Sequence, residues 1–236
     1  MIDKIISILI SIIMAVPLIL VGSLFIFFTI LFPSKMNTFG RLTSIAVLRL
    51  LFVRLEIKGT IPEDRPMIIM FNHSSFIDPF LFAYCVKGKT TGITAIENYK
   101  YPIFGWMLKK WKAIPIDRTN INRAKESIKK GEEAISSGYN VIILPEGTRT
   151  INGKIKKFKK GGFHMAMNIK APILPIGSIG AYEFKPKNRW YIKPGKVTLT
   201  IGEVIEPEEF EELGINGLSD KVRKQFSQLT DYELES

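Results

Sequence analysis

The chain has 236 residues, of which 46% are hydrophobic, and its formal net charge is +11. This length suits one domain with an appended segment, and the positive charge favours nucleic acid, anionic lipid or phosphorylated substrates as partners. Cys85 is the only cysteine, which excludes an internal disulfide, and two histidines without a cysteine cluster argue against a zinc site. We therefore expect no metal centre.

The first segment of the chain is strongly apolar, with no charged residue between Ile5 and Ser34. A helix of that length exceeds the ~30 Å hydrocarbon core of a bilayer. Because the segment has no A-x-A-like cleavage site, residues 1–34 are predicted to be a retained membrane anchor. Pro17 is expected to kink this helix or to divide it into two halves, so both a spanning and a re-entrant path stay open.

Basic residues follow the apolar segment. Residues 35–58 are assigned to an amphipathic helical segment on the membrane surface, although 52–59 also alternate weakly, as an edge strand does. The apolar side of this helix is formed by Leu42, Ile45, Leu48 and Leu51. The positive-inside tendency places this side of the membrane, and the rest of the chain, in the cytoplasm. A membrane anchor without a nucleic-acid motif argues for membrane lipid and against nucleic acid as the partner.

The remaining residues, 59–236, alternate between strand and helix patterns. This order predicts an α/β domain with a mixed, largely parallel sheet flanked by helices. Pro175 predicts that its strand is bulged or lies at an edge, and residues 190–192 and 197–201 are expected to pair around Pro194. Strands are also expected at 67–70, 93–96, 113–116, 141–144 and 173–176, and helices at 79–88, 102–111, 119–137, 163–169 and 219–229.

The turn after the first of these buried strands holds a histidine and a carboxylate. His73 lies just outside the next helix and Asp78 lies in its first turn, so the two side chains can meet. The carboxylate then accepts a hydrogen bond from the protonated ring nitrogen, and the other ring nitrogen is left free as a base. Ser74 or Ser75 is expected to cap this helix. On spacing alone, an ordinary helix start with a solvated Asp78 is an equally good interpretation.

Two further polar clusters follow buried strands, Asp117-Arg118 and the Glu146–Arg149 segment. Because sites form at the carboxyl ends of strands in α/β sheets, we expect the three clusters to converge. Arg118 and Arg149 offer forked donors suited to a phosphate, and Gly147 permits a sharp turn close to a ligand. Glu146 is expected to fix Arg149 or a substrate hydroxyl. No serine occupies a G-x-S-x-G elbow, so a covalent serine route is not indicated.

Two motifs follow each other along the chain: N-H-x-x-x-x-D, at Asn72 to Asp78, and E-G-T-R, at Glu146 to Arg149. In this order they resemble the signature of glycerolipid acyltransferases of the PlsC type. Residues 114–118, 159–163 and 171–176 resemble further blocks of the family, although Ala113 replaces a glycine that is often found before the first of these. The resemblance extends from about residue 40 to residue 205.

The resemblance implies acyl transfer from acyl-CoA or acyl carrier protein to the sn-2 hydroxyl of 1-acylglycerol 3-phosphate (lysophosphatidic acid), which gives phosphatidic acid in phospholipid biosynthesis. His73 would be the general base, oriented by Asp78, with no covalent enzyme intermediate and no cofactor. Backbone N–H groups near the His73 turn would bind the oxyanion. The substrate-binding residues would be Arg118, Glu146, Gly147, Thr148 and Arg149.

Other functions remain open from the sequence. The same chemistry suits glycerol 3-phosphate, lyso-ornithine lipid or another lysophospholipid as acceptor. A thioesterase would use water instead, but it needs no phosphate-binding arginines. A non-catalytic, membrane-anchored lipid binder is the alternative of another class. Cys85 and His164 are expected to be structural, because Cys85 lies in an apolar helix and His164 has no visible acidic partner.

Overall fold

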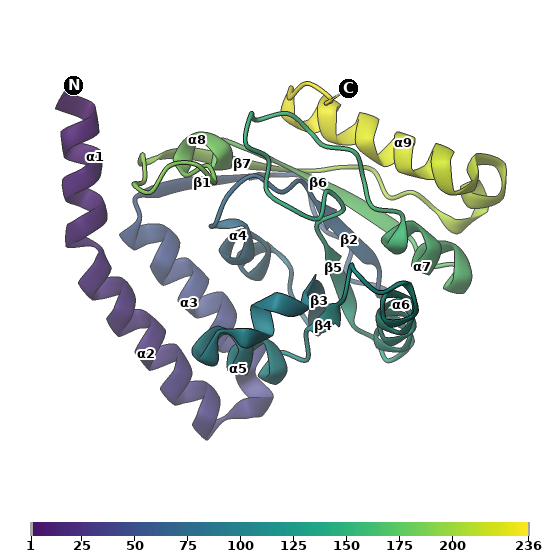
Figure 1. Cartoon of the computed structure of the whole chain (residues 1–236), viewed down its shortest axis with the longest axis horizontal. Helices are drawn as coiled ribbons and strands as arrows, with labels where there is room; N and C mark the ends of the chain where they lie inside the picture. The colour runs from purple at the N-terminus through teal and green to yellow at the C-terminus, as the bar shows by residue number, and fades with distance from the viewer. Residues whose placement is uncertain (1, 236) are drawn as a thin grey trace.

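The computed structural model describes residues 2–235, which form a seven-stranded sheet in the order β1-β7-β6-β2-β5-β3-β4 (Figure 1). Neighbouring strands are parallel except for the antiparallel pair of β6 and β7, which confirms the predicted mixed, largely parallel sheet. The strands are β1 Val53–Lys58, β2 Ile68–Phe71, β3 Thr90–Ala95, β4 Ile114–Ile116, β5 Asn140–Ile143, β6 Ile173–Ile179 and β7 Gly195–Ile201.

Helices cover both faces of the sheet. They are α1 Ile2–Ile13, α2 Ala15–Leu31, α3 Met36–Leu50, α4 Asp78–Cys85, α5 Pro102–Lys110, α6 Ile121–Ser136, α7 Gly161–Ile169, α8 Ala181–Phe184 and α9 Phe210–Thr230. Side chains of β2 alternate between two cores, with Ile69 and Phe71 on one face and Ile68 and Met70 on the other. The first core lies under α3 and α4, and the second lies under α6, α7 and α9 (Figure 1).

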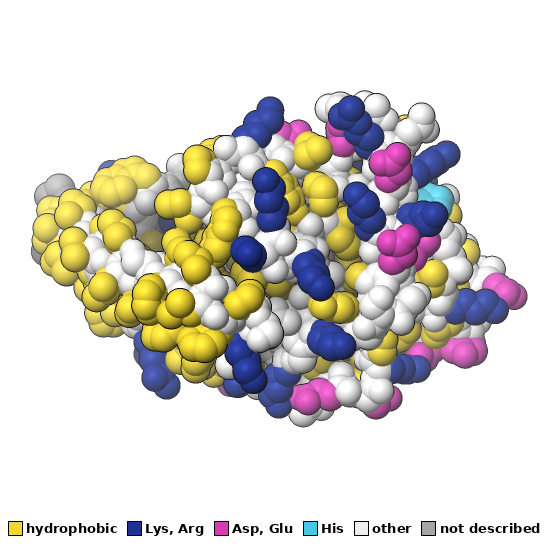
Figure 2. Space-filling model, turned by 90° about the horizontal axis from the view of Figure 1, so that it is seen from below, with side chains coloured by type: hydrophobic (Ala, Val, Ile, Leu, Met, Phe, Trp, Pro, Cys, Tyr) yellow, Lys and Arg dark blue, Asp and Glu magenta, His cyan; other side chains and the backbone are white. Residues whose placement is uncertain are grey.

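The apolar N-terminal segment forms an arm of two helices along one end of the molecule (Figure 1). It is divided at Met14, as predicted from Pro17, because proline has no N–H to bond the carbonyl of Ile13. Together, residues 4–31 are long and apolar enough to cross a membrane. Figure 2 shows the hydrophobic side chains gathered over this end of the molecule, and Val16 and Ile19 are among the most exposed of them.

The predicted membrane-surface segment is α3 followed by β1. Leu48 and Leu51 are buried in the first core, whereas the Leu42 side chain is 56% exposed. The helix therefore packs part of its apolar side on the sheet, and its contact with lipid stays a prediction. Residues 53–58 pair only with β7 among the described strands, so the predicted edge strand is confirmed.

Two predictions for the second half of the sheet were wrong in part. Pro175 lies in β6, which is central rather than an edge strand. Its carbonyl accepts from the Gly202 N–H just where the β6–β7 ladder stops, and pairing resumes at Ile173 with Ile205, so the missing proline donor costs no ladder bond. The predicted pair of 190–192 with 197–201 does not form, because β7 is already paired on both sides, with β1 and β6.

Candidate active site

His73 and Asp78 meet at the carboxyl end of β2. His73 Nδ1 lies 2.8 Å from Asp78 Oδ2, and the Asp78 side chain is only 3% exposed. The same Oδ2 accepts hydrogen bonds from the backbone N–H groups of Ser74 and Ser75, each at 3.0 Å, so this oxygen acts as an acceptor and Nδ1–H of His73 is the donor that fits it. The predicted contact between the two side chains is confirmed, and Nε2 lies on the side of the partly exposed His73 ring away from this contact. The role of His73 as a base stays a prediction.

The serine side chains do not cap α4, contrary to expectation. The residue before the helix is Ile77, and the Asp78 carboxylate reaches back to the serine N–H groups instead. Ser75 Oγ donates to the carbonyl of Lys185 at 2.9 Å. The serine backbone rather than the serine hydroxyls therefore holds the carboxylate in register with His73.

Asn72 is a positioning residue for which the sequence analysis assigned no role. Its side-chain oxygen accepts the Ser178 N–H at 2.7 Å, and its amide donates to the Ser178 carbonyl at 3.1 Å. These two buried bonds tie the end of β2 to β6 in the way a backbone ladder would. The residue before His73 is thereby fixed across two strands, because the Asn72 amide supplies both a donor and an acceptor.

Glu146 does not bind Arg149 as expected. Its carboxylate is buried, with Oε1 2.6 Å from the His73 backbone nitrogen and Oε2 3.1 Å from that of Lys156. Burial raises the pKa of the Glu146 carboxyl to about 7, against the lowering effect of these two N–H donors. Glu146 thus joins the His73 turn to the segment after its own turn. Its predicted role in substrate binding stays a prediction.

The Gly147 turn lies beside the His73 turn, because the Thr150 N–H donates to the His73 carbonyl at 2.9 Å. Gly147 has a φ of +73°, in the left-handed region that favours glycine. A Cβ atom at this position would lie 3.6 Å from Cζ of Arg118. The three predicted clusters therefore converge at the carboxyl ends of β2, β4 and β5.

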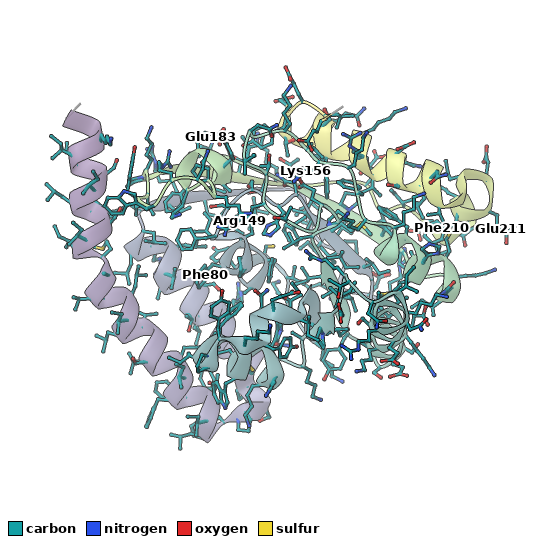
Figure 3. The ribbon with its side chains drawn as sticks, viewed as in Figure 1. Phe80, Arg149, Lys156, Glu183, Phe210 and Glu211 are labelled. Atoms are coloured by element: carbon teal, nitrogen blue, oxygen red, sulfur yellow. The ribbon has the colours of Figure 1, made fainter. Side chains whose placement is uncertain are left out.

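Arginine side chains of two clusters remain available for a ligand. Among residues 4–235, whose side chains the structure describes, neither Arg118 nor Arg149 has a side-chain hydrogen bond or a carboxylate within ion-pair distance. Asp117 instead binds Thr119 and Arg123, which fixes the start of α6 and lowers the pKa of the Asp117 carboxyl. In the view of Figure 3, Arg149 projects near the middle of the molecule. Thr148 is half-buried beside it.

Three backbone N–H groups of the His73 turn already have acceptors in this structure. The N–H of His73 donates to Glu146, and those of Ser74 and Ser75 donate to Asp78. These three groups hold His73 and Asp78 in place. That other backbone N–H groups near the His73 turn bind the oxyanion stays a prediction.

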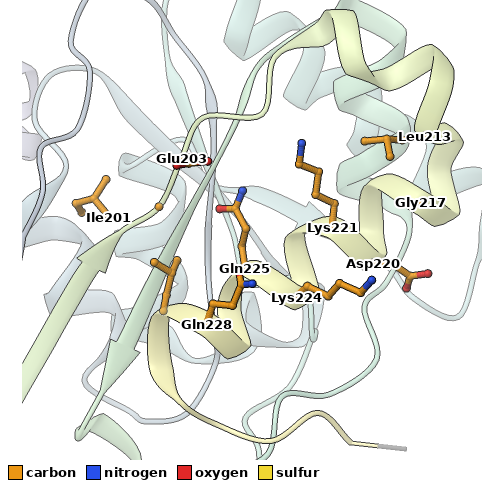
Figure 4. A pocket seen from close by; sticks show the side chains of 11 residues that line it. Ile201, Glu203, Leu213, Gly217, Asp220, Lys221, Lys224, Gln225 and Gln228 are labelled. Atoms are coloured by element: carbon orange, nitrogen blue, oxygen red, sulfur yellow. The ribbon is translucent and has the colours of Figure 1, made fainter.

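A pocket of about 800 Å³ lies between α9 and the end of β7 (Figure 4). Its lining includes Lys221, Lys224 and Gln225 of α9, together with Glu203, and none of the predicted site residues. Lys221 is paired with Glu209 there. The base and the two free arginines are therefore in a different place from this pocket.

Comparison with known proteins agrees with the geometry. The family model described as Acyltransferase matches residues 52–179, a range that includes His73, Asp78 and all of the Glu146–Arg149 segment. The chain belongs to the acyltransferase family. This match covers the sheet from β1 through β6 and the three strand ends at which the site forms. The predicted site residues His73, Asp78, Arg118 and Glu146 to Arg149 therefore all lie within the matched range.

Several relatives are named as 1-acyl-sn-glycerol-3-phosphate acyltransferases. One from Cocos nucifera is 32% identical over 76% of this chain and 59% of its own length. One from Pseudomonas aeruginosa is 35% identical over 66% of this chain and 61% of its own length. The chain thus spans about three fifths of these relatives. The crystal structure of the acyltransferase PlsC from Thermotoga maritima is 26% identical, with a TM-score of 0.79 over 96% of this chain and 97% of that one.

Proposed function

We propose that the chain transfers an acyl group from a thioester to the sn-2 hydroxyl of 1-acylglycerol 3-phosphate, which gives phosphatidic acid. The observation that carries the proposal is the His73–Asp78 pair, with its free ring nitrogen, beside two arginines without carboxylate partners among the described residues. A base without a protein nucleophile activates a hydroxyl, and paired arginines bind a phosphate on the same molecule. The names of the relatives support this acceptor.

His73 Nε2 takes the proton of the acceptor hydroxyl as its oxygen attacks the thioester carbonyl carbon. The C–O bond forms, the tetrahedral intermediate collapses with cleavage of the C–S bond, and the imidazolium returns the proton to the sulfur. Asp78 keeps Nδ1 protonated and stabilises the imidazolium. General-base catalysis of this kind contributes ~10²–10⁴ in rate. A thiol is a good leaving group, so the step is complete without a cofactor.

The two arginines would hold the acceptor phosphate so that its glycerol hydroxyl reaches His73. Arg149 lies one residue before Thr150, which is bonded to the His73 turn, and Arg118 lies across the Gly147 turn. Glu146 orients the turn through the His73 N–H rather than through substrate in this proposal. Gly147 and Thr148 would line the phosphate site, where the turn brings backbone close to the ligand.

The apolar arm would place the site at a membrane surface, where a lyso-lipid lies. The helix at 4–31 supports membrane association, and the basic residues after it support a domain on the cytoplasmic face. Figure 2 shows Lys and Arg side chains spread over the surface next to the apolar end, which suits anionic lipid. Acyl-CoA and acyl carrier protein both remain possible donors.

The test is a transfer assay with reconstituted, full-length protein and labelled acyl-CoA or acyl carrier protein. Lysophosphatidic acid is compared with glycerol 3-phosphate, other lysophospholipids, 1-acylglycerol and no acceptor. We expect phosphatidic acid to form fastest. Faster acylation of another acceptor would replace the proposed substrate, and acceptor-independent release of fatty acid would indicate a thioesterase. No turnover of any donor would favour a lipid-binding protein.

A further inference from the structure

The catalytic turn has a second neighbour besides the Gly147 turn. Residues 185–194 connect α8 to β7. The backbone carbonyl of the first of them, Lys185, accepts a hydrogen bond from Ser75 Oγ at 2.9 Å. Thr150 binds the carbonyl of His73 in the same turn. Because Arg149 precedes Thr150, a lysine and an arginine from distant parts of the sequence both lie next to the catalytic base.

The loop that carries Lys185 is held in one shape. The Arg189 guanidinium donates to the carbonyls of Glu183, Phe184 and Tyr191. The Lys193 N–H closes the same loop by donating to the Phe184 carbonyl at 2.8 Å. These bonds fix both ends of the loop relative to α8. The position of Lys185 is thus set by the fold before any ligand binds, which is the condition for a specific contact.

The Lys185 side chain is half-buried and lies against the His73 turn. Its ammonium lies 5.6 Å from the ring centroid of Phe76, a residue of the catalytic turn, and it donates to the Arg189 carbonyl. No carboxylate among the described side chains of residues 4–235 pairs with this ammonium. Burial, and then the charges of Arg149 and Arg189, lower the pKa of Lys185. Like charges held together without a counter-charge are unfavourable, and a bound anion removes that cost.

We propose that Lys185 is a third cation of the phosphate site and binds, with Arg149, a phosphate group of a substrate. This inference rests on the proposed function. The phosphate belongs either to the lysophosphatidic acid acceptor or to the acyl-CoA or carrier-protein donor. An ammonium is a point donor that adapts to either, whereas Arg149 supplies the forked contact. The sequence analysis missed Lys185 because it lies in a basic loop outside every motif.

The experiment compares K185Q with K185R and with K187Q, in full-length protein reconstituted in vesicles. Lys187 is exposed on the same loop and has no hydrogen bond or ion pair among the described residues. Michaelis constants are measured for lysophosphatidic acid and for 1-acylglycerol, which has no phosphate. They are also measured for acyl-CoA and for an acyl-N-acetylcysteamine thioester, which also lacks a phosphate. Thermal unfolding shows that each variant is folded.

For K185Q we expect the KM for one phosphorylated substrate to rise ten- to 100-fold, with a small change in kcat. The KM for the phosphate-free analogue of that substrate should not change. K185R should restore most of the affinity, and K187Q should match the wild type. A rise confined to lysophosphatidic acid assigns the contact to the acceptor, and one confined to acyl-CoA assigns it to the donor.

Equal KM values in K185Q and wild type, or equal losses with and without phosphate, would overturn the assignment. The result is separable from the proposed function, because the wild-type acceptor panel tests the reaction. The ratio of the KM of K185Q to that of the wild type tests the role of Lys185, for whichever phosphorylated substrate the enzyme accepts.

Discussion

The backbone N–H of His73 donates to Oε1 of Glu146 over 2.6 Å, so the two motifs of the site are joined through a buried carboxylate. The other oxygen of Glu146 accepts the Lys156 N–H, and burial raises the pKa of the carboxyl to about 7. An ordinary glutamate has a pKa near 4.5. The folded protein therefore favours protonated Glu146, although the ionised form is the better acceptor for two N–H groups.

This pKa predicts a pH dependence of stability. A group whose pKa is raised on folding stabilises fully below its unfolded pKa, and this contribution is lost as the pH rises through the folded pKa. Relative to E146Q, which does not titrate, the free energy of unfolding of the wild type should fall by up to about 3 kcal/mol between pH 4.5 and 7. Denaturant unfolding of both proteins in detergent micelles measures it. A constant difference across this window would contradict the prediction.

The paired base predicts large losses of kcat without loss of fold. H73A removes the base, and D78N removes the charge that holds Nδ1–H and stabilises the imidazolium. Each should lower kcat by ~10²–10⁴. H164A is the matched control, because His164 is exposed on α7. Steady-state rates with circular dichroism make the comparison, and substantial activity in H73A would refute the general-base mechanism.

Arg149 should act through affinity. R149Q removes a forked donor from the proposed phosphate site, and loss of a charged hydrogen bond raises KM for lysophosphatidic acid by roughly tenfold or more. K129Q, at an exposed lysine of α6, changes the net charge equally and should leave KM unchanged. An unchanged KM in R149Q, measured at constant ionic strength, would remove this arginine from the acceptor site.

A side chain at Gly147 should lower stability and disturb the site. At a φ of +73°, alanine adds backbone strain of about 1–2 kcal/mol, and its Cβ would lie 3.4 Å from the Lys159 side chain and 3.6 Å from Arg118. G88A provides the control, because Gly88 has a φ of +78° but open space around it. Both variants should be less stable, and only G147A should also raise KM. Similar kinetics in the two variants would show that the turn does not shape the site.

Cys85 should be chemically inert. Burial raises the pKa of its thiol to about 12, so the thiolate is scarce at neutral pH. We expect C85A to keep wild-type kcat and the native thiol to resist iodoacetamide until the protein is unfolded. Mass spectrometry of the alkylated protein reads this out. Fast labelling at pH 7 with loss of activity would contradict a purely structural cysteine.

Features that depend on residues close together in the chain could be predicted from the sequence. The buried strands β2 and β5 are short apolar runs followed by polar residues, and His73 and Asp78 lie only five residues apart in the turn that leads into α4. The helix predicted from residue 119 is α6, which begins at Ile121 and is capped by the Asn120 side chain. These features need no knowledge of the rest of the fold, because the residues involved are close in sequence.

Features that depend on distant residues could not be predicted in this way. Pro175 looks like an edge residue until the break in the β6–β7 ladder is known. The serine N–H groups are held by Asp78, and Glu146 is held by the His73 and Lys156 backbones, which spacing does not reveal. A hydrogen bond between residues 73 positions apart leaves no periodic signal in the sequence.

A hydrogen bond joins the apolar arm to the rest of the domain. Ser11 of α1 accepts the Ile192 N–H at 3.0 Å, and Leu18 and Val21 of α2 pack against the first core. Ile192 belongs to the same loop as Lys185. Deleting the arm to obtain a water-soluble fragment would uncover core side chains and release this loop. Such a fragment would report poorly on the native enzyme, so inhibitors and kinetics are best studied with the arm in place.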